Sequence, residues 1–184
     1  QIDIALAIAD RAVVIERALI ELRAGGAIKG YGLGVTEVGV CMDCLDYGDP
    51  AAFLLAGRYN LLDHGDASPL LAKCNERTVS LVIGAVFASG ILATGPVEGA
   101  LYDYAPASPE MKERVRRLQA VCASHGIALS AAALQYPLAH PAVATVLLGA
   151  GSLRSLGQCI DGLQAEIPQA LWEELRGQGL IEAD

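Results

Sequence analysis

The sequence predicts an α/β protein built around a parallel β-sheet. Short apolar runs alternate along the chain with segments whose apolar residues recur at helical spacing. Strands that are apolar throughout are typical of parallel sheets covered by helices and joined by right-handed crossovers. We expect these strands at residues 28–35, 51–56, 79–84 and 143–148.

Each of the first two strands is followed by one helix. Residues 37–47 have apolar side chains at helical spacing, and Gly48-Asp49-Pro50 then ends the pattern. Residues 66–77 repeat the arrangement after the second strand. Both segments predict helices that pack on the sheet.

The third unit is longer, because a loop at residues 95–107 precedes its helices. Ser108 as N-cap and Pro109 at the first helical position predict a helix start, and the helix is expected over residues 111–125. Ser130 is then expected to cap a second helix that reaches Leu138. The last two helices are expected at residues 152–163 and 168–177.

The start of the chain allows two interpretations. Residues 2–8 could form a fifth strand followed by a helix at residues 11–24, or they could extend that helix. A complete eight-stranded barrel usually needs about 250 residues, whereas the 184 residues here accommodate four or five strand–helix units. Either upstream sequence is absent or the sheet closes differently. We treat residues 1–184 as a single domain.

Composition excludes several classes of protein. The chain is 53% hydrophobic and 18% charged, which describes a well-buried globular domain. A formal charge of −8 opposes binding to nucleic acid, which needs clustered Lys and Arg. The sequence shows no membrane-length apolar run and no basic flank of a signal peptide, so we expect a cytoplasmic protein that does not bind membranes.

The five cysteines are odd in number, so a disulfide framework is not expected. Cys41 and Cys44 form a C-x-x-C motif that could be a redox pair or half of a metal site. They fall on the apolar face of a predicted helix, and no second C-x-x-C or His pair completes four ligands. The pattern therefore favours packing over chemistry, and we expect no metal site.

Two glycine-bearing segments, residues 83–95 and 147–152, follow predicted strands. The second leads directly into a predicted helix, whose free backbone N–H groups and dipole favour an anion. A barrel with a phosphate site after its last two strands has this pattern. Tyr102-Asp103-Tyr104, in the loop after the first segment, could cover a ligand or could vary freely.

Three ordered segments, residues 54–62, 86–95 and 167–172, resemble the aldo/keto reductases. The resemblance is to the branch that contains D-threo-aldose (L-fucose) dehydrogenases and pyridoxal 4-dehydrogenase. It implies the C-terminal half of a (β/α)8 TIM barrel, with strands five to eight present and residues 2–8 as a candidate strand four. It also implies an extended nicotinamide dinucleotide across the C-terminal face of that barrel.

Matched to the family's motifs, the chain has cofactor-binding candidates after every strand. Thr36 takes the place of the residue that holds the nicotinamide carboxamide. Tyr59 matches the tyrosine after strand six. The loop around the pyrophosphate and the region after strand eight supply the other candidates: Phe87, Ser89, Gly90, Leu92, Gly149, Ser152, Arg154 and Gln158.

Some positions depart from the family pattern. The basic residue frequent before Ser152 is Gly151, and Cys159 replaces an asparagine near the adenine. The loss of this basic residue removes a partner for a 2′-phosphate and leaves only Arg154 nearby, so the resemblance favours NAD over NADP.

The family's catalytic Tyr, Lys, Asp and His contexts are not found, so no catalytic residue is nominated. Arg58 and His64 are candidates on the substrate side; the alternatives are a salt bridge at the barrel rim for Arg58 and a turn position for His64.

The implied function is an NAD(P)-dependent oxidoreductase acting on a sugar or other small polar aldehyde or alcohol. The alternative is a non-catalytic half-barrel that serves as an oligomeric or interaction module. The expected partners are accordingly a small-molecule substrate and either a second copy or a missing N-terminal half.

Overall fold

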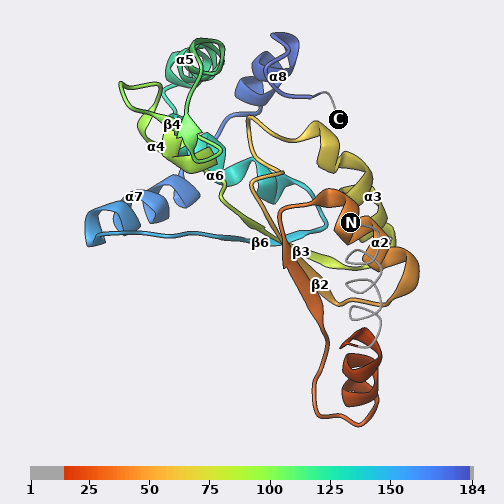
Figure 1. Cartoon of the computed structure of the whole chain (residues 1–184). Helices are drawn as coiled ribbons and strands as arrows, with labels where there is room; N and C mark the ends of the chain where they lie inside the picture. The colour runs from red at the N-terminus through yellow and green to blue at the C-terminus, as the bar shows by residue number, and fades with distance from the viewer. Residues whose placement is uncertain (1–14, 183–184) are drawn as a thin grey trace.

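A four-stranded parallel sheet organises the molecule. The computed structural model describes residues 15–182, and the sheet has the order β1-β2-β3-β6 (Figure 1). Its strands are β1 (Gly32–Val35), β2 (Ala52–Ala56), β3 (Ser80–Gly84) and β6 (Val143–Leu147). All neighbouring pairs are parallel. The α/β class and the four expected strands are therefore confirmed.

The first strand is shorter than expected, because residues 28–31 lie outside β1. The Tyr31 carbonyl still accepts a hydrogen bond from the Ala51 N–H at 2.8 Å. Its phenol, however, bonds to Glu16 and to the Asp49 N–H. This side-chain bonding anchors the approach to β1 separately from the strand ladder. The suggested strand at residues 2–8 lies outside the described residues, and of the expected helix at residues 11–24 the described part, residues 15–24, is helical.

The helices follow the expected order. They are α2 (Val38–Tyr47), α3 (Ser68–Glu76), α4 (Ile91–Thr94), α5 (Pro109–Ser124), α6 (Leu129–Gln135), α7 (Leu153–Gln164) and α8 (Gln169–Gly177). Short 3-10 turns lie at η1 (Gly65–Ala67), η2 (Ala88–Gly90) and η3 (Pro137–Ala139). None of the helices within residues 15–182 is long and apolar enough to cross a membrane.

Helix starts are confirmed where a hydroxyl can cap. Ser108 accepts from the Met111 N–H, and Ser152 forms a reciprocal capping box with Ser155. The prediction that Ser130 caps the second helix is wrong, because Ala128 is the N-cap of α6 and Ser130 lies inside its first turn. That helix ends at Gln135, before the expected Leu138, since Pro137 cannot donate to the helical ladder.

The loop at residues 95–107 contains a small hairpin that the sequence analysis missed. Strands β4 (Leu101–Tyr102) and β5 (Ala105–Pro106) pair antiparallel. Asp103 and Tyr104 form the turn with φ of 47° and 62°. Positive φ at both turn positions is the geometry that matches the twist of a two-residue hairpin.

One face of the sheet carries the core. Phe53, Leu55, Leu81 and Ile83 are at most 1% exposed and pack with buried residues of α2 and α3. A second apolar cluster joins α4, α5, α6 and α8. On the opposite face of the sheet the side chains are less covered, and Leu147 is 55% exposed.

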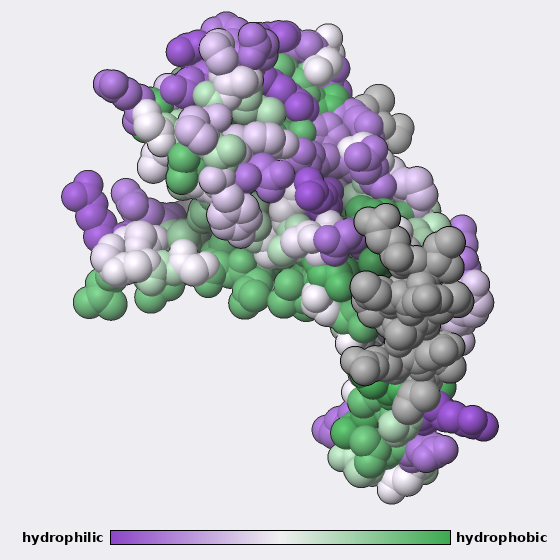
Figure 2. Space-filling model, viewed as in Figure 1, coloured by the Kyte–Doolittle hydropathy of each residue, from purple (hydrophilic) through white to green (hydrophobic). Residues whose placement is uncertain are grey.

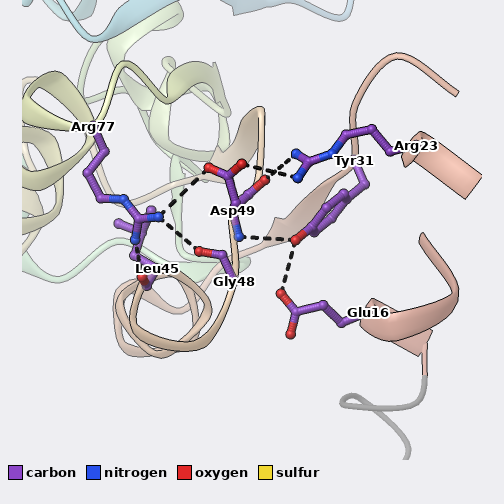
Figure 3. Close-up of polar contacts among 7 residues, drawn as sticks. All are labelled: Glu16, Arg23, Tyr31, Leu45, Gly48, Asp49 and Arg77. Atoms are coloured by element: carbon purple, nitrogen blue, oxygen red, sulfur yellow. Dashed lines mark hydrogen bonds and ion pairs between the residues drawn. The ribbon is translucent and has the colours of Figure 1, made fainter. Parts of the chain in front are cut away.

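A polar network at the amino ends of the strands joins four segments (Figure 3). The Asp49 carboxylate pairs with Arg23 at 3.1 Å and with Arg77 at 3.8 Å. Arg77 also donates to the carbonyls of Leu45 and Gly48. The helix at residues 15–24, the chain before β1, the turn after α2 and the end of α3 are thereby held together.

Candidate functional site

The carboxyl ends of all four strands border one pocket. This strand-end pocket has a volume of about 340 Å³. The exits of β1, β2, β3 and β6 and the tip of the hairpin line it, with Thr36, residues 56–58, 85–90, 147–149 and 102–104 among its residues. Loops at the carboxyl ends of parallel strands are where such folds place their functional groups.

The loop after β3 has an unusual backbone. Ala85, Ala88 and Ser89 have φ of 56°, 46° and 57°, and Gly90 follows at 98°. Left-handed conformations are costly for residues with a Cβ and tend to persist at ligand-binding sites. The loop is held by its own hydrogen bonds, since the Gly90 and Leu92 N–H groups both donate to the Phe87 carbonyl at 2.9 and 3.1 Å.

The hairpin covers this loop and is fixed at two points. The Tyr102 hydroxyl donates to the Asp63 carboxylate at 2.6 Å, and the Tyr104 N–H donates to Ser89 Oγ at 3.1 Å. Burial, with the Asp63 contact adding to it, raises the pKa of Tyr102 to about 12. Of the two interpretations of Tyr102-Asp103-Tyr104, the structure therefore favours a cover over the pocket.

Arg58 and Thr36 both line the strand-end pocket and contact each other. Arg58 Nε donates to the Thr36 carbonyl at 3.2 Å. The Thr36 hydroxyl in turn donates to Glu37 at 2.8 Å, and the side-chain and backbone hydrogen bonds from Thr36 lower the pKa of Glu37. Arg58 thus lines the pocket, and its charge also acts on the neighbouring Glu37 carboxylate.

A second pocket adjoins the first. This helix pocket, of about 470 Å³, lies between α6 and α7 and shares Phe87 and Gly149 with the strand-end pocket. Gln158 and Asp161 of α7 also line it. A Cβ added at Gly149 would meet no atom within 4 Å, so the fold itself does not require glycine where the pockets meet. Glycine at this position leaves the space between the two pockets open.

The structure therefore brings together many of the expected site residues. Thr36, Arg58, Phe87, Ser89, Gly90 and Gly149 line the strand-end pocket, and Gln158 lines the helix pocket. Ser152 and Arg154 line neither; Ser152 uses its hydroxyl to cap α7.

Three expected residues lie elsewhere. Leu92 is fully buried in the helical core, and its N–H is bonded to Phe87. Tyr59 lines a different pocket of about 400 Å³ together with Tyr136 and Trp172. His64 is 8% exposed, and its Nδ1 lies 3.1 Å from the Asn60 carbonyl oxygen, so the ring is held inside the turn and does not face the strand-end pocket.

Asp63 and Asp161 are residues near the pockets to which the sequence analysis gave no ligand role. Asp63 anchors the hairpin through Tyr102, a contact between residues 39 positions apart. Asp161 faces the helix pocket because α6 packs beside α7. Neither contact has a local sequence signal.

The cysteine motif packs as expected. Cys41 is fully buried, and burial raises the pKa of its thiol to about 12. Burial also raises the pKa of Cys44, which keeps both sulfurs in the unreactive thiol form at neutral pH. Within residues 15–182, no group of three or more His, Cys, Asp or Glu side chains could hold a metal ion.

Comparison with known proteins identifies relatives of this arrangement. The aldo/keto reductase family model matches residues 6–178. The chain is 43% identical over 165 residues to a pyridoxal 4-dehydrogenase from Microbacterium luteolum, covering 90% of this chain and 48% of that protein. It is 34% identical over 165 residues to a D-threo-aldose 1-dehydrogenase from a Pseudomonas species, covering 89% and 50%.

A solved structure shows the same half-length match. The holo form of an aldo-keto reductase from Bacillus halodurans superposes with a TM-score of 0.69 at 26% identity, covering 92% of this chain and 56% of that one. The chain thus spans about half the length of the relatives it matches, and its parallel sheet matches about half of their barrel. The family typically uses NAD or NADP. Through this match over nearly its whole length, the chain belongs to the aldo/keto reductase family.

Proposed function

We propose that this chain supplies the dinucleotide-binding half of an NAD-dependent aldo/keto reductase that acts on a sugar or other small polar aldehyde or alcohol. The observation that carries the proposal is the pair of pockets joined at Phe87 and Gly149. One lies at the strand ends and the other between two helices, so together they suit an elongated ligand with two ring systems. In this assignment β1, β2, β3 and β6 take the places of strands five to eight of the barrel.

Three groups of lining residues are assigned to three parts of the ligand. Thr36 and Arg58 lie at the β1 edge, where the nicotinamide end fits. The self-bonded loop around Phe87, Ser89 and Gly90 lies between the two pockets, where the pyrophosphate fits. The helix pocket, with Gln158, receives the adenosine end. When bound, the nucleotide donates or accepts a hydride; the chain binds and orients it.

The described residues do not provide an obvious acid for the carbonyl oxygen. Tyr102 lines the pocket, but its hydroxyl already donates to Asp63 and its pKa is raised to about 12, which makes it a weak acid at neutral pH. We therefore assign the catalytic acid to a part of the enzyme outside residues 15–182.

The lining of the helix pocket supports NAD over NADP. Among the described residues that line it there is no Lys or Arg, and Asp161 brings a carboxylate. A 2′-phosphate would meet this carboxylate without a cation to offset it. Arg154, the basic residue nearest in sequence, does not line the pocket.

Nucleotide fluorescence tests both parts of the proposal. We expect saturable binding of NADH, tighter than that of NADPH. Gly151→Arg should strengthen NADPH binding by about 10-fold, because a charged hydrogen bond contributes about 1.5 kcal/mol. Gly151→Gln, which is long but uncharged, is the matched control.

The same titration is repeated on a fusion that joins the chain to the amino-terminal half of the 43%-identical relative. Absence of saturable binding in both proteins would overturn the nucleotide proposal. Equal strengthening by Gly151→Gln and Gly151→Arg would overturn the 2′-phosphate argument alone.

A second candidate function is a non-catalytic oligomeric half-barrel. The exposed apolar side chains at both ends of the sheet favour it. A protein that binds NADH, assembles with itself and turns over no aldehyde or sugar, even as the fusion, would support this alternative.

A further inference from the structure

Helix α7 lines the helix pocket with polar side chains. Ser155, Gln158 and Asp161 follow one another at intervals of three residues, which places them along one side of the helix, and all three line the pocket. In Figure 2 the α7 arm on the left is hydrophilic along its upper side, which is turned towards α4 and α6 in Figure 1. The other wall of the pocket is largely apolar and includes Ile127 and Leu134. The pocket therefore has one wall that suits a flat ring and one that suits polar groups.

The last turn of α7, which contains Asp161, is held against α6. A Cβ added at Gly162, the next residue, would lie 3.1 Å from Leu134 Cδ1, so the two helices approach closely at this point. Gln135 Nε2 also donates to the carbonyls of Gly162 and Ala165, each at 2.8 Å. All of these contacts join residues 134–165, away from both ends of the described chain. The position of Asp161 is therefore set by the pocket's own two helices.

Asp161 is available to a ligand, whereas Ser155 is not. Ser155 Oγ donates to the Ser152 carbonyl at 2.9 Å and accepts from the Ser152 N–H at 3.0 Å, so its hydroxyl is used in capping α7. Within residues 15–182, the side chains of Gln158 and Asp161 have no hydrogen-bond or ion-pair partner. The Asp161 carboxylate therefore offers two acceptor oxygens to a molecule in the pocket.

We propose that Asp161 accepts hydrogen bonds from the 2′- and 3′-hydroxyls of the adenosine ribose. The inference rests on the proposed function, which assigns the adenosine end of the nucleotide to this pocket. Two neighbouring hydroxyl donors match the two oxygens of one carboxylate, and acidic side chains bind the ribose 2′-hydroxyl in other NAD-binding folds. A 2′-phosphate would replace one donor by negative charge. Asp161 thus recognises the ribose of NAD directly, in addition to disfavouring NADP.

Fluorescence titration of Asp161→Asn with NADH tests this contact in the chain and in the fusion. Asparagine has nearly the same shape but one acceptor oxygen and no charge, so NADH should bind about 10-fold more weakly than to the parent. NADPH binding should not weaken, because the substitution also removes a like charge from the pocket. Glu166→Gln is the matched control and should change neither affinity, since Glu166 is an exposed carboxylate just after α7 that does not line the pocket.

Two modified nucleotides separate the ribose from the base. NADH without the 2′-hydroxyl on its adenosine ribose should bind the parent about 10-fold more weakly than NADH, whereas Asp161→Asn should bind the two equally. Deamino-NADH has hypoxanthine in place of adenine and lacks the amino group of the base. Asp161→Asn should weaken its binding by the same factor as that of NADH, because its ribose is unaltered.

Three results would overturn the ribose contact while leaving the nucleotide site intact. They are unchanged NADH binding by Asp161→Asn, equal weakening of NADH and NADPH, and an effect that disappears with deamino-NADH; the last would assign the carboxylate to the adenine amino group. Absence of NADH binding by the parent, in the chain and in the fusion, would overturn the proposed function as well. Urea unfolding should match the parent for both variants, because both substituted side chains are exposed.

Discussion

Gly149 is the residue whose substitution best tests the joined pockets. Gly149→Val should weaken NADH binding about 10-fold or more, because its branched side chain would enter the space shared by the two pockets. The free energy of unfolding should change little, since a Cβ at this position meets no atom within 4 Å. Fluorescence titration and urea unfolding measure the two effects.

Gly151→Val is the control for this prediction. Gly151 also has open space around a built Cβ, but it does not line either pocket. An equal loss of NADH affinity in both variants would mean that glycine acts through backbone freedom, and not by leaving room for the ligand.

At the residue scale, the sequence predicted which loops lie near the pocket better than it predicted where their side chains point. Phe87, Ser89 and Gly149 were expected at the site and line the strand-end pocket. His64 follows the same strand as Arg58, yet its ring bonds to the Asn60 carbonyl within its own turn. Position after a strand predicts nearness to the pocket, whereas side-chain direction depends on contacts made in three dimensions.

At the scale of elements, the hairpin is held by a bond that depends on pH. In the folded protein the pKa of Tyr102 is raised to about 12, above the value of about 10 for an unperturbed phenol. The protonated hydroxyl therefore stabilises the fold fully below about pH 10, and this contribution is lost as the pH rises toward 12. We predict that Tyr102→Phe is less stable than the parent chain at pH 8 and that the difference shrinks above pH 10.

Urea unfolding at several pH values measures this difference. Tyr104→Phe is the control, because that side chain is 89% exposed. A stability difference between parent and Tyr102→Phe that stays constant from pH 8 to 12 would contradict the assignment of the Tyr102 pKa.

The Asp49 network is an element-level anchor remote from the site. Asp49→Asn should lower the free energy of unfolding by about 1 kcal/mol, because two partly exposed arginines lose their carboxylate. NADH affinity should be unchanged, since the network lies at the amino ends of the strands.

Asp43→Asn, an exposed carboxylate on α2, is the control for charge removal and should change stability by less than about 0.5 kcal/mol. Chemical unfolding measures both variants. Equal destabilisation by the two substitutions would show that net charge, and not the network, is responsible.

Element order was predictable because local chemistry specifies it. Ser108 and Ser152 cap the helices that they were expected to start. The hairpin was missed because its turn is Asp103-Tyr104, which lacks the glycine or asparagine that usually signals positive φ. The hairpin is held by Asp63 and Ser89, which are distant from it in sequence. A short stretch of sequence around the hairpin therefore does not reveal these contacts.

At the scale of the whole molecule, hydrogen exchange should report which strands of the sheet are central. The amides of β2 and β3 are central in the sheet and should exchange slowest. Those of β1 and β6 should exchange faster, because among residues 15–182 each of these strands has a neighbouring strand on one side. Equal exchange rates in all four strands would contradict this expectation.

The sequence did not show which strands lie at the edges of the sheet. The apolar runs at residues 51–56 and 79–84 predicted buried strands, and β2 and β3 are the inner strands of the sheet. The run at residues 143–148 gave a similar signal, but Leu147 remains 55% exposed. Hydrophobicity predicts that a strand needs neighbours, and only the spatial arrangement shows on which side a neighbour is lacking.

The loop after β3 has a consequence for how this part of the molecule can be reused. Its left-handed residues and the bonds from Gly90 and Leu92 to Phe87 all close within a few positions of the chain. These bonds set the turn, but Val86 and Leu92 are buried in the two apolar clusters, so the loop also depends on contacts with the core. Grafted after another parallel strand, the loop would keep its curvature only if that protein also received the side chains of Val86 and Leu92 in its core.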